Sequence, residues 1–195
     1  MKNLYHLSQS EYANLFLKKN NFKFTFIGDY TNQLYLNNSF SINKKKEDLV
    51  IYNPKKGYKY LEKIIINNKN KFIPIVNMSN DEIYNLMQKS KVYIDLGRLP
   101  GKDRIPREAC AMKNIIILGK RGSGSNDIDF PIPNSFKIDL RNSNYIDTVN
   151  YLINDSIENY EAKIKLFENY KEKLILEKEI FYKNTKNFFD NIIYR

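Results

Sequence analysis

The 195-residue chain contains one cysteine, one histidine, no tryptophan and only seven glycines. A single cysteine, Cys110, excludes a disulfide framework within the chain and suits a reducing compartment. Because His6 is the only histidine, the sequence excludes a metal cluster built from several histidines. The first residues lack the apolar core and cleavage site of a signal peptide, and no apolar run is long enough to span a membrane. We therefore expect a cytoplasmic protein, with the inner face of the membrane as an alternative location.

Positive charge, in contrast, is abundant. The chain has 32 lysines and arginines against 22 acidic residues, which gives a net charge of +10 at pH 7. By itself this charge fits a phosphate-bearing small ligand, a peripheral membrane contact and nucleic acid equally well. The lysines are spread along the chain, and the sequence has neither a zinc-knuckle spacing nor an RNA-recognition signature. Nucleic acid is therefore not the partner we expect.

Strands and helices are predicted to alternate through the middle of the chain. Short apolar runs indicate strands, and apolar residues at helical spacing indicate helices between them. The predicted strands cover residues 24–27, 49–52, 72–76, 92–96, 114–118 and 136–138, and the predicted helices cover residues 58–67, 81–89 and 105–112. Pro74 places its strand at an edge or a bulge. This order predicts an α/β fold, a Rossmann-like three-layer sandwich with a mainly parallel sheet and right-handed crossovers.

The two ends of the chain have different patterns. Ser8, with Glu11 three residues later, predicts the start of an N-terminal helix, whereas the polar residues 31–47 predict loop or edge structure. From residue 144 onward, apolar side chains recur every three, four or seven positions. This pattern predicts two helices, the second about 35 residues long and broken near Asn184. We expect residues 1–48 to be a remnant of, or a linker to, a first domain, and residues 49–195 to form the main domain with the C-terminal helices.

Residues 92–127 hold most of the features that point to a ligand. Five of the seven glycines lie there, in two loops that also carry arginines and lysines. Glycine-rich turns between the end of a strand and a helix are where α/β proteins hold phosphorylated ligands. Pro106 suits the first turn of a helix, and Glu108 is expected in that same turn. There Glu108 could accept hydrogen bonds from a ribose diol beside Arg104 and Arg107, or it could only stabilise the helix start and pair with one of these arginines.

Two further turns are candidates, each with a plainer alternative. Lys55 and Lys56 stand between a strand and a glycine, where a lysine can reach a diphosphate or can simply be solvated. The loop of residues 119–127 could direct backbone amides at an anion, or it could be a flexible connection. No catalytic residue and no metal ligand is assigned. The full set of candidate ligand-binding residues is Lys55, Lys56, Gly101, Lys102, Asp103, Arg104, Arg107, Glu108, Gly122 and Ser123.

Three segments carry a resemblance to a known family: IYNPKKG, NMSNDEIYNLMQKSKVYIDL and REACAMKNIIILGKRGS. In this order they resemble the nucleotide-sugar-binding half of the GT-B glycosyltransferases, over about residues 49–195. The resemblance implies that Lys55 or Lys56 lies near the donor diphosphate, that Glu108 holds the donor ribose, and that the C-terminal helix crosses back to another domain. It implies glycosyl transfer for bacterial surface polysaccharide or glycoconjugate synthesis, with the nucleotide-sugar as substrate and no cofactor.

The sequence also departs from this family. Retaining members carry two glutamates at a fixed spacing, and Pro100 stands where the first is expected, so that Asp103 is the candidate substitute for a sugar-contacting carboxylate. A GT-B enzyme has two Rossmann-like domains with its active site between them, and this chain has room for one. Three hypotheses follow: a piece of a longer protein with a missing N-terminal domain, a chain that works with a partner chain, or a non-catalytic nucleotide-binding or partner subunit.

Overall fold

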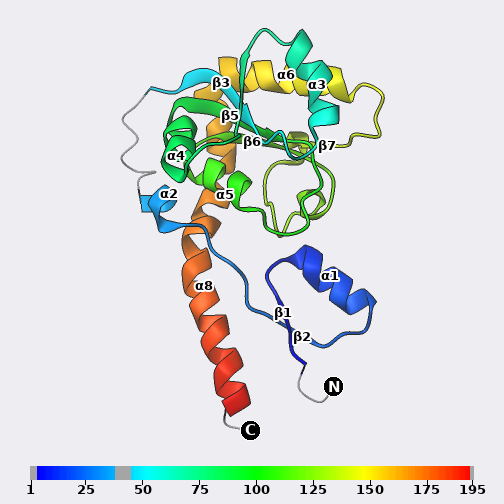
Figure 1. The fold of residues 1–195 in the computed structure, drawn as a ribbon, viewed down its shortest axis with the longest axis vertical. Coiled ribbons are helices and arrows are strands. Elements are labelled where there is room, and N and C mark those ends of the chain that lie inside the picture. The colour runs from blue at the N-terminus through cyan, green and yellow to red at the C-terminus, as the bar shows by residue number, and fades with distance from the viewer. Residues whose placement is uncertain (1–3, 38–44, 194–195) are drawn as a thin grey trace.

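The computed structural model of the chain describes residues 4–37 and 45–193. Its centre is a five-stranded sheet with the strand order β4-β3-β5-β6-β7, in which all neighbouring strands are parallel (Figure 1). The strands are β3 (Glu47–Tyr52), β4 (Lys71–Pro74), β5 (Ser90–Asp95), β6 (Ile115–Gly119) and β7 (Lys137–Ile138). The predicted α/β fold with a mainly parallel sheet is therefore confirmed.

The three central strands consist almost entirely of buried apolar residues. Val50 and Ile51 in β3, and the run of isoleucines that begins at Ile115 in β6, are completely buried. Such continuous apolar runs are typical of parallel sheets, because helices cover both faces. Pro74 ends the edge strand β4, as expected for a residue that has no N–H to donate to a second neighbour.

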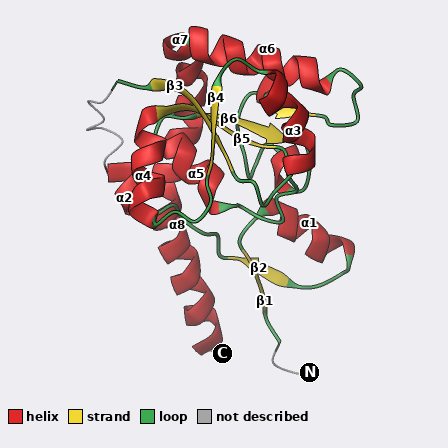
Figure 2. Cartoon of the chain, turned by 45° about the horizontal axis from the view of Figure 1, so that its top comes forward, coloured by secondary structure: helices red, strands yellow, loops and turns green. Residues whose placement is uncertain are grey.

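Helices cover the two faces of the sheet. α3 (Tyr58–Asn67) and α6 (Tyr145–Glu158) lie on one face, and α4 (Asn80–Lys89) and α5 (Arg104–Ala111) lie on the other (Figures 1 and 2). α4 begins where it does because of a capping box, in which the Ser79 hydroxyl accepts from the Glu82 N–H and the Glu82 carboxylate accepts from the Ser79 N–H. Short 3₁₀ turns, η2 (Ser123–Ser125) and η3 (Asn134–Phe136), connect β6 to β7.

The N-terminal part contains a small parallel pair of strands, β1 (His6–Ser8) and β2 (Phe24–Phe26), joined through α1 (Glu11–Lys19). Ser8 lies in β1, so its predicted role as a helix cap is wrong. The cap is Ser10, whose hydroxyl accepts from the Ala13 N–H at 3.1 Å.

A short helix, α2 (Gln33–Asn37), follows in the region predicted as loop or edge. That prediction is wrong for α2 and for the start of β3 at Glu47, while residues 38–44 lie outside the described part. α2 forms because Tyr35 and Leu36 are buried against the main core. The predicted division of the chain at residue 48 stays a prediction.

The C-terminal helices are α7 (Tyr160–Ile164) and the long α8 (Glu168–Ile193), separated by the 3₁₀ turn η4 (Lys165–Phe167). The predicted break near Asn184 is wrong, because α8 runs through this position. The interruption comes earlier, at η4, where Phe167 is buried with its ring 5.0 Å from that of Phe136.

The second half of α8 runs beside the N-terminal part (Figure 1). Its aromatic side chains contact that part directly, since the rings of Phe188 and Tyr5 are 5.7 Å apart and those of Phe181 and Tyr30 are 5.1 Å apart. Among the described residues, no helix combines the length and the apolar character that crossing a membrane requires.

Candidate functional site

Three turns meet at the carboxyl edge of the sheet, and glycines allow them to touch. Gly57, after β3, has a φ of 67°, and a Cβ on it would lie 2.4 Å from the N atom of Gly97, after β5. Gly122, after β6, has a φ of 64°, and its Cβ would lie 2.0 Å from the Leu99 carbonyl oxygen. Both positions require glycine for the backbone angle and for the close approach. The turns that the sequence singled out are therefore packed into one assembly.

A cavity of about 230 Å³ opens between these turns. Its walls are formed by Asn53, Lys56, Tyr93, Asp95, Asp103, Arg104, Ile105 and Pro106. Lys56 Nζ lies 2.6 Å from Asp103 Oδ2, in an ion pair that is partly open to solvent. Arg104 is the first residue of α5, so its cationic group stands at the positive end of that helix. Two cations at this edge of the sheet can attract a phosphate group, and two acids, Asp95 and Asp103, line the same cavity.

Asp95 is a buried acid at the end of β5, and it was not among the predicted site residues. Its carboxylate accepts from the Gly97 N–H at 2.8 Å and from the Tyr93 hydroxyl at 3.2 Å. Burial raises the pKa of Asp95 to about 6, although these hydrogen bonds and the charge of Lys56 oppose the rise. The signal in the sequence is an acidic residue at the end of an otherwise apolar strand.

Glu108 is buried with one carboxylate oxygen unused. Its Oε1 lies 3.3 Å from Arg104 Nε, whereas its Oε2 has no hydrogen-bond partner among the described residues. Burial raises the pKa of Glu108 to about 7, despite the nearby charges of Arg104 and Arg107. Glu108 lies in the second turn of α5, so its predicted place in the first turn is wrong. A buried carboxylate oxygen that lacks a hydrogen-bond partner is a candidate for a ligand contact.

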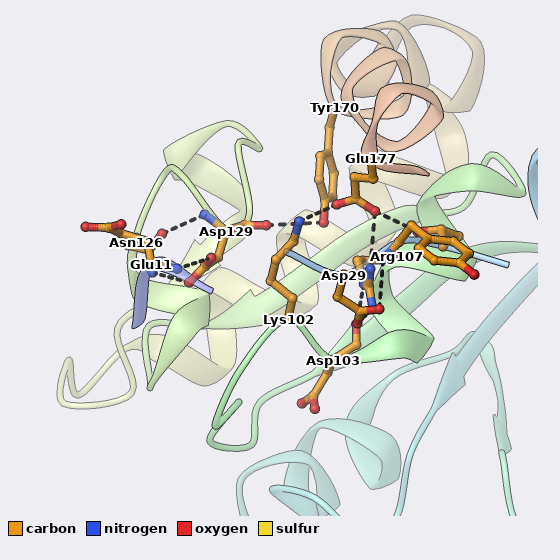
Figure 3. Close-up of polar contacts among 11 residues, drawn as sticks. Glu11, Asp29, Lys102, Asp103, Arg107, Asn126, Asp129, Tyr170 and Glu177 are labelled. Atoms are coloured by element: carbon orange, nitrogen blue, oxygen red, sulfur yellow. Dashed lines mark hydrogen bonds and ion pairs between the residues drawn. The ribbon is translucent and has the colours of Figure 1, made fainter. Parts of the chain in front are cut away.

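Lys102 and Arg107 face a different network, which reaches α8 (Figure 3). Arg107 Nη1 lies 3.2 Å from Glu177 Oε2, and Arg107 Nη2 lies 2.6 Å from Asp29 Oδ2. Lys102 Nζ contacts the other oxygen of Glu177, and the Thr31 hydroxyl donates to Glu177 Oε2 at 3.2 Å. The Arg107 guanidinium is buried and does not line the cavity. In this structure Lys102 joins α8 to the loop after β5, and Arg107 joins α8 and the residues after β2 to α5.

A second polar cluster holds the start of α1 (Figure 3). The Asp129 carboxylate accepts from the Glu11 and Tyr12 N–H groups at 2.8 and 2.9 Å, and from Asn126 Nδ2 at 2.8 Å. A carboxylate at this place satisfies free amides and the positive end of the helix. The Tyr170 hydroxyl, from α8, donates to the Asp129 carbonyl at 3.4 Å. The N-terminal part is thus fixed against the loop that follows β6.

The predicted residues fall into separate places. Lys56, Asp103 and Arg104 line the cavity, whereas Glu108 does not line it and pairs with Arg104. Lys55 is exposed, with its backbone N–H donating to Asn53 Oδ1 at 3.0 Å.

The remaining predicted residues lie in loops that are held by hydrogen bonds within the chain. The Ser123 hydroxyl donates to the Gly101 carbonyl at 2.6 Å, and the Ser123 N–H donates to the Leu99 carbonyl at 2.8 Å. Amides at positions 120, 121, 123, 125 and 126 all donate to carbonyl oxygens of the chain. The loop that contains Gly122 is therefore a packed connection with few amides directed outward.

Known structures resemble this chain, although no protein-family model and no curated protein sequence matches it. Sucrose-phosphate synthase (tll1590) from Thermosynechococcus elongatus aligns with 98% of this chain and 59% of its own, at 10% identity and a TM-score of 0.75. Anabaena Alr3699/HepE in complex with UDP-glucose aligns with 94% of this chain and 63% of its own, at 11% identity and a TM-score of 0.66. The same protein in complex with UDP and glucose gives a TM-score of 0.67, again at 11% identity, over 93% of this chain and 62% of its own.

The chain thus spans less than two thirds of each of these proteins. At such low identity the likeness concerns the fold alone. The chain has the fold of these solved structures, which agrees with the resemblance found in the sequence.

Proposed function

We propose that this chain binds the diphosphate of a nucleotide-sugar at the carboxyl edge of its sheet, as the donor-binding part of a glycosyltransferase. The observation that carries the proposal is the cavity in which Lys56 and Arg104 come together at the ends of β3 and β5. Open α/β sheets bind ligands outside the carboxyl ends of their strands, and helix N-termini there favour phosphates.

Without a ligand, the charge of Lys56 is balanced by its ion pair with Asp103. The ammonium group is held 2.6 Å from a carboxylate that is itself partly exposed, so a diphosphate with more negative charge can compete for it. Arg104 can add bidentate hydrogen bonds to phosphate oxygens. In a transfer reaction both cations would neutralise the charge that develops on the departing nucleoside diphosphate.

Glu108 completes the proposed site as the acceptor for a ribose diol. Two hydroxyl donors would satisfy the bare Oε2 and favour the ionised carboxylate, which burial now disfavours. Arg104 would then lie between the ribose contact and the phosphate contact, because it already pairs with Glu108. A role in ligand binding would explain why the chain keeps a buried carboxylate that lowers the stability of the free protein.

The reaction, the acceptor and the location are wider proposals. HepE was solved with UDP-glucose, which makes uridine nucleotides the first ligands to test. Because this chain spans less than two thirds of that protein, we propose that a further domain or a partner chain completes the cleft for transfer. The sequence resemblance supports a role in bacterial surface polysaccharide or glycoconjugate synthesis. The net charge of +10 supports a peripheral contact with the inner face of the membrane.

The experiment is a thermal-unfolding panel of nucleoside diphosphates and nucleotide-sugars with the wild-type chain, Lys56→Gln and Arg104→Gln. A nucleotide at a hundred times its Kd adds about 2.7 kcal/mol to the unfolding free energy. We expect stabilisation by one class of nucleotide, and weaker stabilisation in both variants. Lys63→Gln is the matched control, since Lys63 is exposed on α3 and its loss changes the net charge equally. Failure of every nucleotide to stabilise the wild-type chain, or an equal loss in the control, would contradict the proposal.

A further inference from the structure

A larger cavity lies at the opposite, amino edge of the sheet. It has a volume of about 750 Å³ and is framed by the residues before β3 and β6, the start of β5, and the segment from the end of α6 to the start of α8. Figure 2 shows α7 following α6 at this end of the molecule. Six lysines line the cavity against three glutamates: Lys45, Lys46, Lys91, Lys113, Lys165 and Lys171 against Glu158, Glu161 and Glu168.

Two of the lysines that line this cavity have lowered pKa values. Lys46 Nζ donates to the carbonyl oxygens of Met87 and Met112, at the ends of α4 and α5, at 2.8 and 2.7 Å. Burial, together with the charge of Lys113, lowers the pKa of Lys46 to about 7. Burial and the same neighbour lower the pKa of Lys171. Like charges that face one cavity repel each other, although Glu168 offsets part of the effect at Lys171, and a bound anion would relieve the repulsion.

The surrounding acids leave part of this charge unbalanced. Glu158 pairs with Lys69, which lies outside the cavity, at 3.5 Å. Lys91 is already paired with Asp48 at 2.6 Å. Lys113, in contrast, forms no ion pair within the described part of the chain, and its backbone φ is 59°. A positive φ is uncommon in a residue other than glycine, and it determines the course of the backbone at Lys113 in the cavity wall.

The floor of the cavity is apolar. Cys110, Ile157, Tyr160 and Phe167 are buried residues that line it. The Tyr160 hydroxyl donates to the Lys113 carbonyl at 2.5 Å, so the ring is fixed below the lysines. A rim of cations above an apolar floor suits a phosphate group attached to an apolar or aromatic body.

We infer that the amino-edge cavity is a second ligand site, which binds a small soluble molecule carrying a multivalent phosphate group. Its volume is within the range of about 300–1,000 Å³ that is usual for small-molecule sites. The lysines surround a hollow instead of covering a flat face, which favours a small molecule over a membrane surface. The two sites lie at opposite edges of one sheet, so this inference does not depend on the proposed nucleotide-sugar site.

The probe is inorganic tripolyphosphate, titrated by calorimetry into a chain that carries Lys56→Gln and Arg104→Gln to remove the site at the carboxyl edge. Lys113→Asn and Lys165→Gln are each added to this background. Asparagine tolerates the left-handed backbone at position 113, and Lys165 is exposed, so both variants are expected to fold. Lys63→Gln, from the exposed side of α3, is the control for net charge.

We expect tripolyphosphate to bind the background chain, and Lys113→Asn to weaken binding about tenfold, as the loss of one close charge requires. Lys165→Gln should weaken binding less, and Lys63→Gln should leave it unchanged. No binding to the background chain, or an equal loss in the control, would overturn the inference. Binding of the background chain to phosphatidylglycerol vesicles that is lost in Lys113→Asn, without competition by tripolyphosphate, would overturn it in favour of a membrane surface.

Discussion

Replacing Glu108 with glutamine should stabilise the free protein, and by an amount that depends on pH. Glu108 is 1% exposed, and burial raises its pKa from an ordinary value of 4.5 to about 7. The folded state therefore binds its proton more tightly than the unfolded state. Below pH 4.5 the group is protonated in both states and has no effect on stability. As the pH rises from 4.5 to 7 the wild-type protein loses stability, and above pH 7 the full loss is about 3 kcal/mol.

Glu108→Gln removes the charge and keeps the shape of the side chain. The attraction of Arg104, whose side chain is 57% exposed, already opposes the rise in the pKa of Glu108, so the value of about 7 includes this pair. The variant should match the wild type at pH 4.5 and exceed its unfolding free energy by about 3 kcal/mol at pH 8.

Urea denaturation at several pH values between 4.5 and 8 measures this difference. Glu179→Gln, at an exposed position on α8, is the control and should show no such dependence. A Glu108→Gln variant that is less stable than the wild type at every pH would refute the reasoning, because the folded state would then favour the ionised carboxylate. The same variant should bind nucleotide more weakly if the Oε2 atom accepts from a ribose.

Other predictions follow from the loops and from α8. Glu177→Gln should lower the unfolding free energy by about 3 kcal/mol in urea denaturation, because it removes the negative partner of two largely buried cations, whereas Glu179→Gln should not. Gly57→Ala should lower it by at least about 2 kcal/mol and weaken nucleotide binding in calorimetry, since a Cβ would lie 2.4 Å from the N atom of Gly97. Burial raises the pKa of the Cys110 thiol, so a thiol reagent should label it in urea and not in the folded protein; fast labelling without denaturant would contradict its buried position.

The middle of the fold could be predicted from the sequence because its signals are local. The helix expected over residues 58–67 has these bounds in the structure, and the ends of the strands around it differ from the expected ones by at most two residues. The continuous apolar runs of β3, β5 and β6 alternate with amphipathic helices, and each of these signals can be found within a short stretch of sequence. The three glycine-containing turns could be found for the same reason, since each follows a clear strand.

The elements that were missed depend on tertiary contacts. β1 has three residues and is a strand only because β2 lies beside it, and α2 is held by the burial of Tyr35 and Leu36. The turn η4 interrupts the C-terminal helices where Phe167 enters the core, and no proline or glycine marks this place in the sequence. Short elements of this kind have weak local signals.

The location of the candidate site could be predicted from the sequence, but the ion-pair partners of its residues could not. Lys56, Arg104 and Glu108 were selected because of the turns they occupy; Lys56 and Arg104 line one cavity in the structure, and Glu108 pairs with Arg104. Arg107 was selected by the same reasoning, but its guanidinium is bound by Asp29 and Glu177, which lie 78 and 70 residues away in the sequence. Sequence proximity cannot reveal which of several neighbouring cations is already paired with a distant acid.

The central claim is that Lys56 and Arg104 form the diphosphate site, with Glu108 beside the ribose. A crystal structure of the chain soaked with UDP tests this most directly. We predict phosphate oxygens within hydrogen-bond distance of Lys56 Nζ and the Arg104 guanidinium, with a ribose hydroxyl on Glu108 Oε2. A nucleotide bound elsewhere, for example in the lysine-lined cavity at the amino edge, with Lys56 still paired to Asp103, would contradict the claim.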